Sequence, residues 1–354
     1  MALIIQKLFY IIFAFQLLLA GNDLDIKSLI PQDLSYQAKL GQTLMFNIGP
    51  NTDETFLRKI IKDYKIGNFN LIGTYSQPTE VKRLTKIIQE ESKKYLSLEP
   101  FIAVDEEGYI KRLNFLNSVP QGNFKNQNEA YREALIRGDH LRSLGFNMVF
   151  SPVLDFTENT KSYIWPRTFQ KDLATTVLLG KAMIKGYGDV GIISIPKHFP
   201  GYINNTKDPH GNDMTITKFS DYNSSLNVFK QVVKDSSPYG LMMAHVSIEE
   251  FGDKPITRSR EMVNFLYNEL NYYGLFVTDS LGMQSFRLND SFEETSLESL
   301  LSGYNLLILS SNKDVSLEIV DQLYKNLGSE EMQNAIDKSF FKIYFLKKSL
   351  GLDK

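Results

Sequence analysis

Short apolar runs alternate with longer amphipathic segments along most of the chain. Each run is nearly continuous and rich in β-branched or aromatic residues, as expected of a parallel strand that is buried on both faces. The segments between them repeat their apolar positions about every 3.6 residues, which is typical of helices. The runs cover 44–49, 69–74, 101–105, 148–156, 192–199, 241–246, 275–280 and 306–311, and clear helical segments cover 54–64, 79–95, 128–144, 173–188 and 261–270.

Strands and helices that alternate eight times predict an α/β protein, and specifically a (β/α)8 TIM barrel. An open doubly wound sheet is the alternative, but no glycine-rich GxGxxG follows the first run to support dinucleotide binding. No linker rich in Pro or Gly divides the body of the chain. We therefore expect one catalytic domain over residues 22–354.

The N-terminus carries a targeting signal. An apolar stretch at 8–20 follows Lys7, as in a secretory signal peptide. It is shorter than the ~20 residues that a membrane-spanning helix needs. We predict a signal peptide at 1–21, with an uncleaved N-terminal anchor as the alternative. Either reading exports the rest of the chain to the periplasm or the extracellular space.

Composition narrows the possible functions. The net charge is −2, from 39 Lys and Arg against 41 Asp and Glu, whereas a surface that tracks phosphates needs excess positive charge. The chain has no Cys, so disulfides, thiolate metal sites, a catalytic thiol and a lipid-modified cysteine are excluded. We expect no nucleic-acid partner, no cofactor, no metal, and membrane contact only through an uncleaved leader. A barrel of this size can be a monomer.

Several of the apolar runs end in charged or titratable residues. In a barrel the carboxyl ends of all strands open onto one face, where the active site lies. A carboxylate is costly to bury without partners, so converging charged groups indicate a wet cleft rather than a core. These run ends are Asp105, Asp155, Lys197 with His198, His245, and Asp279.

The densest chemistry follows the fifth run. The sequence Lys-His-Phe-Pro-Gly at 197–201 precedes Asp208 and His210, which lie on a loop. A carboxylate two residues from an imidazole can orient the ring and stabilise its cation. A surface turn with an incidental Asp and His is the competing interpretation.

Asp279 follows the seventh run and precedes small residues. A carboxylate at this point can attack an electrophilic carbon. The same position would also suit a helix N-cap, since Asp caps helices well. The residue pattern alone leaves both roles open.

The motifs together resemble glycoside hydrolase family 3, specifically its single-domain bacterial β-N-acetylglucosaminidases. They occur in the order typical of that family. They are AVDEEG (103–108), SPVLDF (151–156), RTF (167–169), KHFPG (197–201), DPH (208–210), MAHV (243–246) and TDSLGM (278–283). The resemblance implies a retaining exo-β-N-acetylglucosaminidase that releases terminal GlcNAc from peptidoglycan fragments or related saccharides.

The resemblance also assigns roles. Asp279 would be the nucleophile that forms a covalent glycosyl-enzyme. His210, polarised by Asp208, would be the acid/base, where most retaining glycosidases use a second carboxylate. A small saccharide or muropeptide would be the substrate. Its sugar would contact Asp105, Arg112, Arg167, Lys197 and His198.

Two segments depart from the family pattern. Glu107 and Gly108 are followed by Tyr109, one glycine short of the usual motif, which makes Arg112 the least secure contact. Tyr202 and Ile203 stand where the family usually has His-Gly after KHFPG. We expect the second departure to change the start of the catalytic loop.

Other functions stay open at this stage. Within the family, another β-glycosidase or a phosphorylase is possible, because a neutral imidazole does not repel phosphate. A metal-dependent amidohydrolase could use His198, His210, His245 and Asp279 as ligands. A catalytically silent sugar-binding protein is the non-enzymatic alternative. Lys197 could also be only a structural counter-ion to Asp105 or Asp155, and Trp165 could stack on a sugar or pack in the core.

Overall fold

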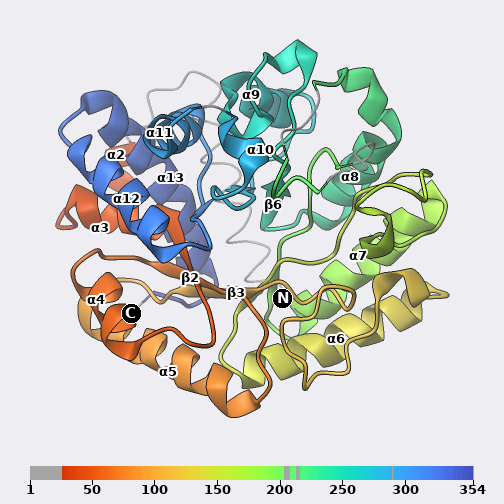
Figure 1. Ribbon diagram of the computed structural model, residues 1–354, viewed down its shortest axis with the longest axis horizontal. Coiled ribbons are helices and arrows are strands. Elements are labelled where there is room, and N and C mark those ends of the chain that lie inside the picture. Colours follow the sequence, from red (N-terminus) through yellow and green to blue (C-terminus); the bar gives the residue numbers. More distant parts are fainter. Residues whose placement is uncertain (1–25, 203–207, 213–215, 289, 354) are drawn as a thin grey trace.

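The computed structural model describes residues 26–202, 208–212, 216–288 and 290–353 (Figure 1). The signal peptide predicted at 1–21 lies outside these residues. Within the described ranges, no helix combines the length and apolar character needed to cross a membrane.

Within the described ranges, eight strands form the centre of the molecule, and every paired neighbour runs parallel. Regular pairing gives the order β3-β2-β1-β8, together with the pairs β4-β5 and β6-β7. The strands are β1 (Leu44–Ile48), β2 (Asn68–Leu71), β3 (Phe101–Val104), β4 (Met148–Val149), β5 (Ile193–Ser194), β6 (Gly240–Met243), β7 (Leu275–Thr278) and β8 (Leu307–Ile308).

Backbone hydrogen bonds outside the regular pairing join these groups into a ring. The Phe150 amide donates to the Val104 carbonyl at 3.1 Å, which links β4 to β3. The Met242 amide donates to Pro196 at 3.0 Å, and the Thr278 amide donates to Leu306 at 3.0 Å. The last two bonds link β6 to the end of β5 and β7 to the start of β8. Each strand therefore adjoins the next in chain order, and the predicted (β/α)8 barrel is confirmed.

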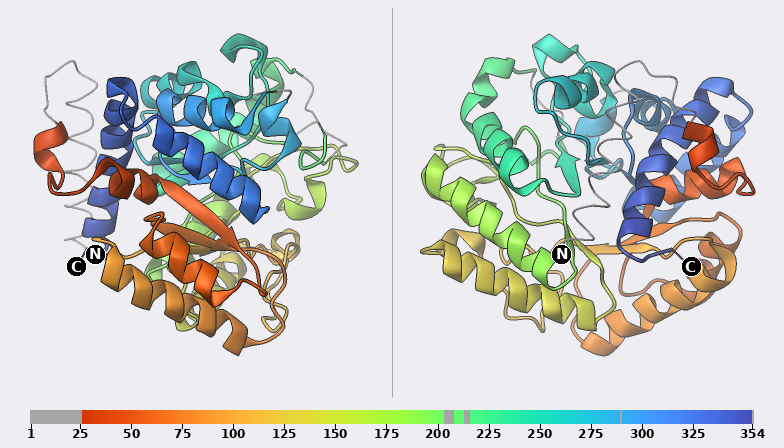
Figure 2. Two further views of the ribbon diagram at one scale, coloured as in Figure 1. Left: turned by 60° about the vertical axis from the view of Figure 1, so that its left-hand side comes forward. Right: turned by 180° about the vertical axis from the view of Figure 1, so that it is seen from behind.

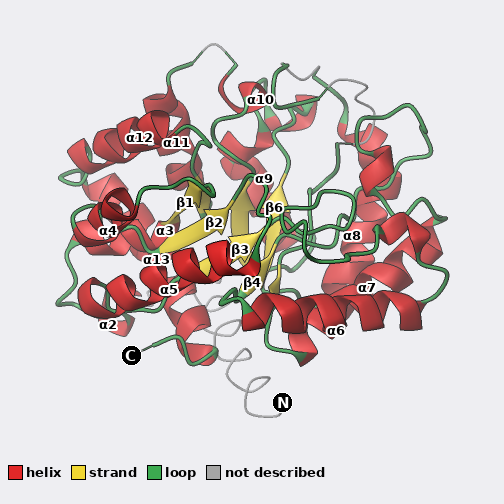
Figure 3. Ribbon diagram, turned by 60° about the horizontal axis from the view of Figure 1, so that its bottom comes forward, coloured by secondary structure: helices red, strands yellow, loops and turns green. Residues whose placement is uncertain are grey.

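Helices surround the strands on the outside (Figures 1 and 3). The helices that follow strands β1 to β8 are α4 (Glu54–Lys62), α5 (Pro78–Tyr95), α6 (Gln127–Ser143), α7 (Leu173–Asp189), α8 (Asn223–Ser236), α9 (Arg260–Asn268), α11 (Phe292–Ser302) and α12 (Lys313–Lys325). Further helices are α2 (Ile26–Leu29), α3 (Tyr36–Thr43), α10 (Gln284–Arg287) and α13 (Glu330–Ser349).

Local sequence explains where several helices begin. The carboxylates of Asp53 and Asp172 accept hydrogen bonds from the amides of Phe56 and Thr175, at 2.8 and 2.9 Å. Such N-caps satisfy amides that have no partner inside the helix. The helical segments expected at 54–64 and 173–188 therefore start where the caps place them.

The fourth and fifth strands are shorter in the structure than predicted from the sequence. The run at 148–156 contributes only Met148 and Val149 to regular pairing, and the run at 192–199 only Ile193 and Ser194. The rest of each run stays beside its neighbour through isolated bridges such as Val153 to Lys197. These irregular strand ends carry polar residues of the site described below.

Side chains alternate between two cores. In β1 and β3, for example, Phe46 and Ile102 pack outward against the helices, whereas Met45 and Phe101 fill the barrel. The inner cluster also contains Ile343 and Leu346 of α13, which covers the amino ends of the strands (Figure 2). One end of the barrel is thus closed by apolar packing, and the carboxyl end is left for polar groups.

Candidate active site

The inward rows of the strands turn polar at the carboxyl end of the barrel. In β3 the inward residues Phe101 and Ala103 are followed by Asp105, and in β7 Leu275 and Val277 are followed by Asp279. The same step brings Asn47, Asn70 and Lys197 to this end. All five line a pocket of about 310 Å3 whose floor includes Phe150, Met242 and Ile308 of the inner core. Strand alternation alone therefore gathers residues from five strands around one cavity.

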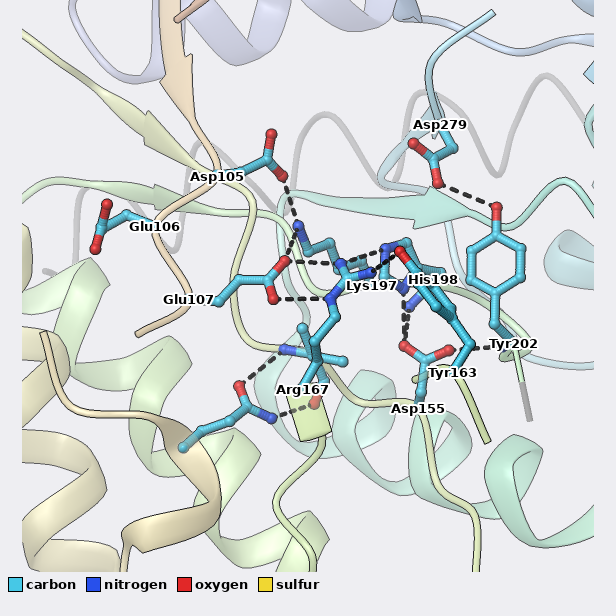
Figure 4. A network of polar contacts seen from close by, with 12 residues as sticks. Asp105, Glu106, Glu107, Asp155, Tyr163, Arg167, Lys197, His198, Tyr202 and Asp279 are labelled. Carbon is cyan, nitrogen blue, oxygen red and sulfur yellow. Dashed lines mark hydrogen bonds and ion pairs between the residues drawn. The ribbon is translucent and has the colours of Figure 1, made fainter. Parts of the chain in front are cut away.

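Glu107 is the centre of the charge network in this pocket (Figure 4). Its two carboxylate oxygens accept hydrogen bonds from Arg167, from Nε at 2.9 Å and from Nη2 at 2.8 Å. Lys197 Nζ lies 2.6 Å from the same Glu107 and 2.6 Å from Asp105. Side chains of Glu107 and Lys197 are only 1% exposed, while that of Asp105 is 20% exposed. Asp105 is therefore the carboxylate of this network that a ligand can reach.

Electrostatics keep this network ionised. Burial alone would raise the pKa of Glu107, but the guanidinium of Arg167 and the ammonium of Lys197 lower it well below the usual range. Burial alone would lower the pKa of Lys197, but the carboxylates of Asp105 and Glu107 raise it. Buried charges with opposite partners and good hydrogen bonds hold fixed positions.

The loop after β3 needs its glycine to aim Glu107. Gly108 has φ of +88°, and a Cβ there would lie 2.2 Å from the carbonyl oxygen of Val119. The turn sends the neighbouring Glu106 the other way, where its carboxylate accepts from the amides of Arg112 and Leu113 at 2.9 and 3.1 Å. The two adjacent glutamates thus do different work: one orders the loop and the other orders the pocket.

His198 is fixed by a second buried carboxylate. Asp155 Oδ2 accepts from the His198 amide at 2.9 Å and lies 2.8 Å from its Nδ1. The other ring nitrogen, Nε2, lies 3.2 Å from Nη2 of Arg167, which can only donate. The contacts therefore place a proton on Nδ1 and leave Nε2 as an acceptor. Although burial would raise the pKa of Asp155, His198 lowers it.

Asp279 faces the pocket with both oxygens hydrogen-bonded. Oδ1 accepts from the Ser280 amide at 2.7 Å, and Oδ2 accepts from the hydroxyl of Tyr202 at 3.1 Å. Burial would raise the pKa of Asp279, but the nearby imidazoles of His198, His245 and His210 and the Ser280 amide lower it to about 2. The carboxylate is ionised at neutral pH, as a nucleophile must be.

His210 and Asp208 form a pair at the rim of the same pocket. The Asp208 carboxylate accepts from the His210 amide at 2.9 Å and lies 2.6 Å from its Nδ1. The His210 side chain is 58% exposed and lines the pocket together with Pro209. The carbonyl of His210 accepts from the Gln284 amide at 3.2 Å, which ties this turn to α10 beyond Asp279. With Nδ1 occupied, Nε2 is the nitrogen available for proton transfer.

His245 supports the site from below. Its Nε2 lies 3.1 Å from the carbonyl of Ser280, which can only accept, so Nε2 carries the proton and Nδ1 accepts from Thr257 Oγ1 at 2.8 Å. Burial lowers the pKa of His245 to about 4. A neutral imidazole thus orders the residue after Asp279.

Two asparagines set an acceptor into the pocket wall. The carbonyl of Leu309 accepts from Asn47 Nδ2 at 2.6 Å, and Asn47 Oδ1 accepts from Asn70 Nδ2 at 2.9 Å. Because a carbonyl cannot donate, this order fixes both amide orientations. Asn70 Oδ1 is buried and has no hydrogen-bond partner among the described residues. It is an acceptor held ready for a donor group of a ligand.

Arg112, the remaining predicted contact, also reaches the pocket. Its buried Nε has no hydrogen-bond partner within the described part of the chain. From the loop that carries Arg167, Tyr163 lines the pocket, while Trp165 is half-buried. The guanidinium of Arg167 lies 6.0 Å from the centre of the Tyr163 ring.

The structure brings all eight predicted site residues to one cavity. Asp279, His210, Asp105, Arg112, Arg167, Lys197 and His198 line it, and Asp208 contacts His210 at its rim. The suggestion that Lys197 pairs with Asp105 or Asp155 is right for Asp105 and wrong for Asp155, which holds His198 instead. Sequence reasoning missed Glu107 and Tyr202. The signal for Glu107 was an acidic pair before a glycine, and Tyr202 was visible only as a departure from the family.

The histidines suggested as ligands of a metal-dependent amidohydrolase are not arranged around a common metal position in the described part of the chain. Both ring nitrogens of His198 and of His245 already have protein partners. Across the ranges that the structure describes, no group of three or more His, Asp or Glu side chains is placed to hold a metal ion.

Comparison with known proteins places this geometry in a family. The glycosyl hydrolase family 3 N-terminal domain matches residues 35–346. The β-hexosaminidase LpqI of Mycobacterium tuberculosis is 26% identical over 337 residues, covering 90% of this chain and 84% of that protein. The β-hexosaminidase A of Pseudoalteromonas piscicida is 29% identical over 285 residues, covering 72% of this chain and 47% of that protein.

Solved structures share the fold. The β-N-acetylhexosaminidase from Beutenbergia cavernae superposes with a TM-score of 0.80 at 20% identity, covering 90% of this chain and 100% of that one. A family 3 β-N-acetylglucosaminidase from Paenibacillus superposes with a TM-score of 0.79 at 25% identity, covering 91% of this chain and 64% of that one. The matches extend around the whole barrel.

Proposed function

The chain belongs to the glycosyl hydrolase family 3 N-terminal domain family, and on that premise we propose that it is a retaining exo-β-N-acetylglucosaminidase. Asp279 is the nucleophile, and His210 with Asp208 is the acid/base. The observation that carries the proposal is one pocket of about 310 Å3 lined by both Asp279 and His210. Relatives named β-hexosaminidases support the choice of sugar class.

The first chemical step uses the charges described above. Asp279 is ionised and attacks the anomeric carbon while the bond to the leaving oxygen breaks. His210 in its protonated form gives that oxygen a proton from Nε2, and Asp208 stabilises the imidazolium through Nδ1. The product of this step is a glycosyl ester on Asp279. In the second step neutral His210 takes a proton from water, whose oxygen displaces the Asp279 carboxylate.

The charge network orients the sugar before these steps. Asp105 presents a partly exposed carboxylate that can accept hydrogen bonds from two hydroxyls. Lys197, Arg167 and Glu107 hold it in place, and His198 presents Nε2 beside Arg167. A pocket closed by apolar core residues at its floor suits a terminal sugar, which is the reason for proposing exo action.

Export and natural substrate extend the proposal. The leader expected at 1–21 would carry the enzyme to the periplasm or outside the cell, where GlcNAc-ended peptidoglycan fragments or related saccharides occur. A monomer with no nucleic-acid partner and no cofactor is sufficient for this chemistry.

Azide rescue tests the two roles separately. Asp279→Ala should lose at least 1,000-fold in kcat on an aryl β-GlcNAc, and azide should restore turnover with an α-glycosyl azide as product. His210→Ala should keep glycosylation of substrates with good leaving groups, and azide should then yield the β-glycosyl azide. Activity of Asp279→Ala equal to that of the wild type would refute the assignment.

Substrate class and reaction type need two further arms. Aryl glycosides that differ only at C2 should show a preference for acetamido over hydroxyl. With phosphate added, a hydrolase should still release the free sugar, whereas a sugar 1-phosphate would identify a phosphorylase. Binding of GlcNAc with no turnover of any glycoside would identify a silent sugar-binding protein.

A further inference from the structure

Tyr202 contacts the carboxylate of Asp279 from a buried position. The residue is 1% exposed, and it stands where the family usually has a histidine. Its hydroxyl lies 3.1 Å from Asp279 Oδ2 and accepts from the His245 amide at 2.8 Å. Since the phenol has one proton and the carboxylate can only accept, Tyr202 donates that proton to Asp279. A chain of hydrogen bonds thus runs from the end of β6 through Tyr202 to the end of β7.

The tyrosine has little freedom to move. Its backbone amide donates to Asp155 Oδ1 at 2.6 Å, on the same carboxylate that holds His198. Its ring meets the His198 imidazole edge to face, with centroids 5.0 Å apart. Burial and the charge of Asp279 raise the pKa of Tyr202 well above its usual value, so the hydroxyl stays a donor across the working pH range. Figure 4 shows the hydroxyl directed at Asp279.

We propose that Tyr202 is a positioning residue that holds the Asp279 carboxylate for attack and favours its departure when the glycosyl ester is hydrolysed. The proposal rests on the proposed function, because it acts on the same nucleophile. It assigns a task to a residue that this chain has in place of the family's histidine.

The chemistry makes the hydrogen bond matter differently in the two steps. When Asp279 bonds to the anomeric carbon, the carboxylate becomes a neutral ester and the hydrogen bond from Tyr202 weakens. When water replaces Asp279, the ester C–O bond breaks and its electron pair returns to the carboxylate, while the water proton passes to His210. The bond from Tyr202 then strengthens. Tyr202 therefore stabilises the second transition state relative to the ester, and it offers the first step mainly orientation.

The test separates the two steps kinetically. On an aryl β-GlcNAc with a good leaving group, hydrolysis of the ester limits kcat, while kcat/KM reports its formation. Tyr202→Phe should lower kcat about 10-fold and kcat/KM less than about 3-fold, with a burst of released phenol equal to one per enzyme. Tyr222→Phe is the matched control, because Tyr222 is equally buried but its hydroxyl lies 2.9 Å from Thr217 Oγ1. That variant should leave both constants unchanged.

Other outcomes decide against the proposal. Equal losses in kcat and kcat/KM, or no loss in either, would show that Tyr202 only packs. If Tyr202→Phe does not fold, 3-fluorotyrosine at position 202 replaces it: a stronger donor of nearly the same size should raise kcat, and an unchanged or lower kcat would overturn the idea. Asp279→Ala is run beside these variants. Full activity of that variant would refute the proposed function itself. An inactive Asp279→Ala together with an unaffected Tyr202→Phe would refute only the role of Tyr202.

Discussion

Glu107→Gln removes a buried charge that Arg167 and Lys197 share. The amide keeps the size of the side chain and can still accept one hydrogen bond, but it no longer balances two cations. Lys197 retains Asp105 as a partner at 2.6 Å, whereas Arg167 loses its bidentate carboxylate. The variant therefore measures how much of the site depends on Glu107.

The magnitude follows from burial. Removing one partner of a buried ion pair typically costs ~3–5 kcal/mol, because a charge is left uncompensated in a poorly solvated place. Since Glu107 and Lys197 are each 1% exposed, solvent screening gives little relief. We expect the free energy of unfolding to fall by about 3 kcal/mol at pH 7, the lower end, because Lys197 keeps Asp105. Displacement of the sugar contacts should also lower kcat/KM by about 100-fold, or ~2.7 kcal/mol.

The pH dependence gives a second check. The pKa of Glu107 is lowered in the folded protein relative to ~4.3 when unfolded, so its contribution is fully present above about pH 4.3. As the pH falls below that value, the unfolded chain takes up a proton that the folded chain refuses. The gap in stability between wild type and Glu107→Gln should therefore be constant near neutrality and narrow below about pH 4.3.

Urea unfolding followed by circular dichroism measures both quantities. Glu54→Gln is the matched control, because Glu54 pairs with Arg83 at 2.7 Å but its side chain is 45% exposed. An exposed pair of this kind contributes ~1 kcal/mol at most. If Glu107→Gln and Glu54→Gln lose the same stability, and both keep the wild-type kcat/KM, the reasoning about the buried network is refuted.

Three further predictions concern the supports of the site. Asp208→Asn should lower kcat about 100-fold with little change in KM, because Asp208 stabilises the His210 cation. Steady-state rates on an aryl β-GlcNAc measure this effect. A loss in kcat below about 3-fold would show that Asp208 and His210 do not act together. The pKa of His245 is lowered to about 4 from ~6.5, so wild-type stability should fall as the pH drops from about 6.5 toward 4, by ~3 kcal/mol in total. His245→Gln should lose this dependence in urea titrations at several pH values, and a parallel fall in both proteins would count against it. Gly108→Ala should cost at least ~2 kcal/mol, because φ is +88° and the new Cβ would meet Val119 at 2.2 Å; an unchanged melting temperature would contradict the strained-turn argument.

The hydrophobic periodicity predicts the barrel because strands and helices each leave a local pattern in the sequence. The strands are buried on both faces: Phe101 is buried inside the barrel and Phe276 is buried against the helices. Their sequences are therefore continuous apolar segments. Their order along the chain then fixes the face on which Asp105 and Asp279 emerge. The motifs further locate the predicted site residues along the chain, and the structure brings them to one cavity.

The network itself depends on contacts that no local pattern encodes. Glu107 and Arg167 are 60 residues apart, and Tyr202 and Asp279 are 77 apart. Which of two adjacent glutamates enters the pocket depends on the positive φ of Gly108, and the sequence shows only that a glycine follows them. Tyr202 resembles any core aromatic residue until the end of β7 is placed against its hydroxyl. Long-range placement, rather than residue type, decided what could not be predicted.

Trapping the intermediate tests the central claim most directly. A fluorinated N-acetylglucosaminyl fluoride slows both steps through its electron-withdrawing ring fluorine, while the leaving fluoride keeps the first step faster than the second. After digestion, mass spectrometry should find one added sugar on the peptide that contains Asp279, and none in the Asp279→Ala variant. A modified peptide elsewhere, or complete inactivation with Asp279 unmodified, would contradict the assignment of Asp279 as nucleophile.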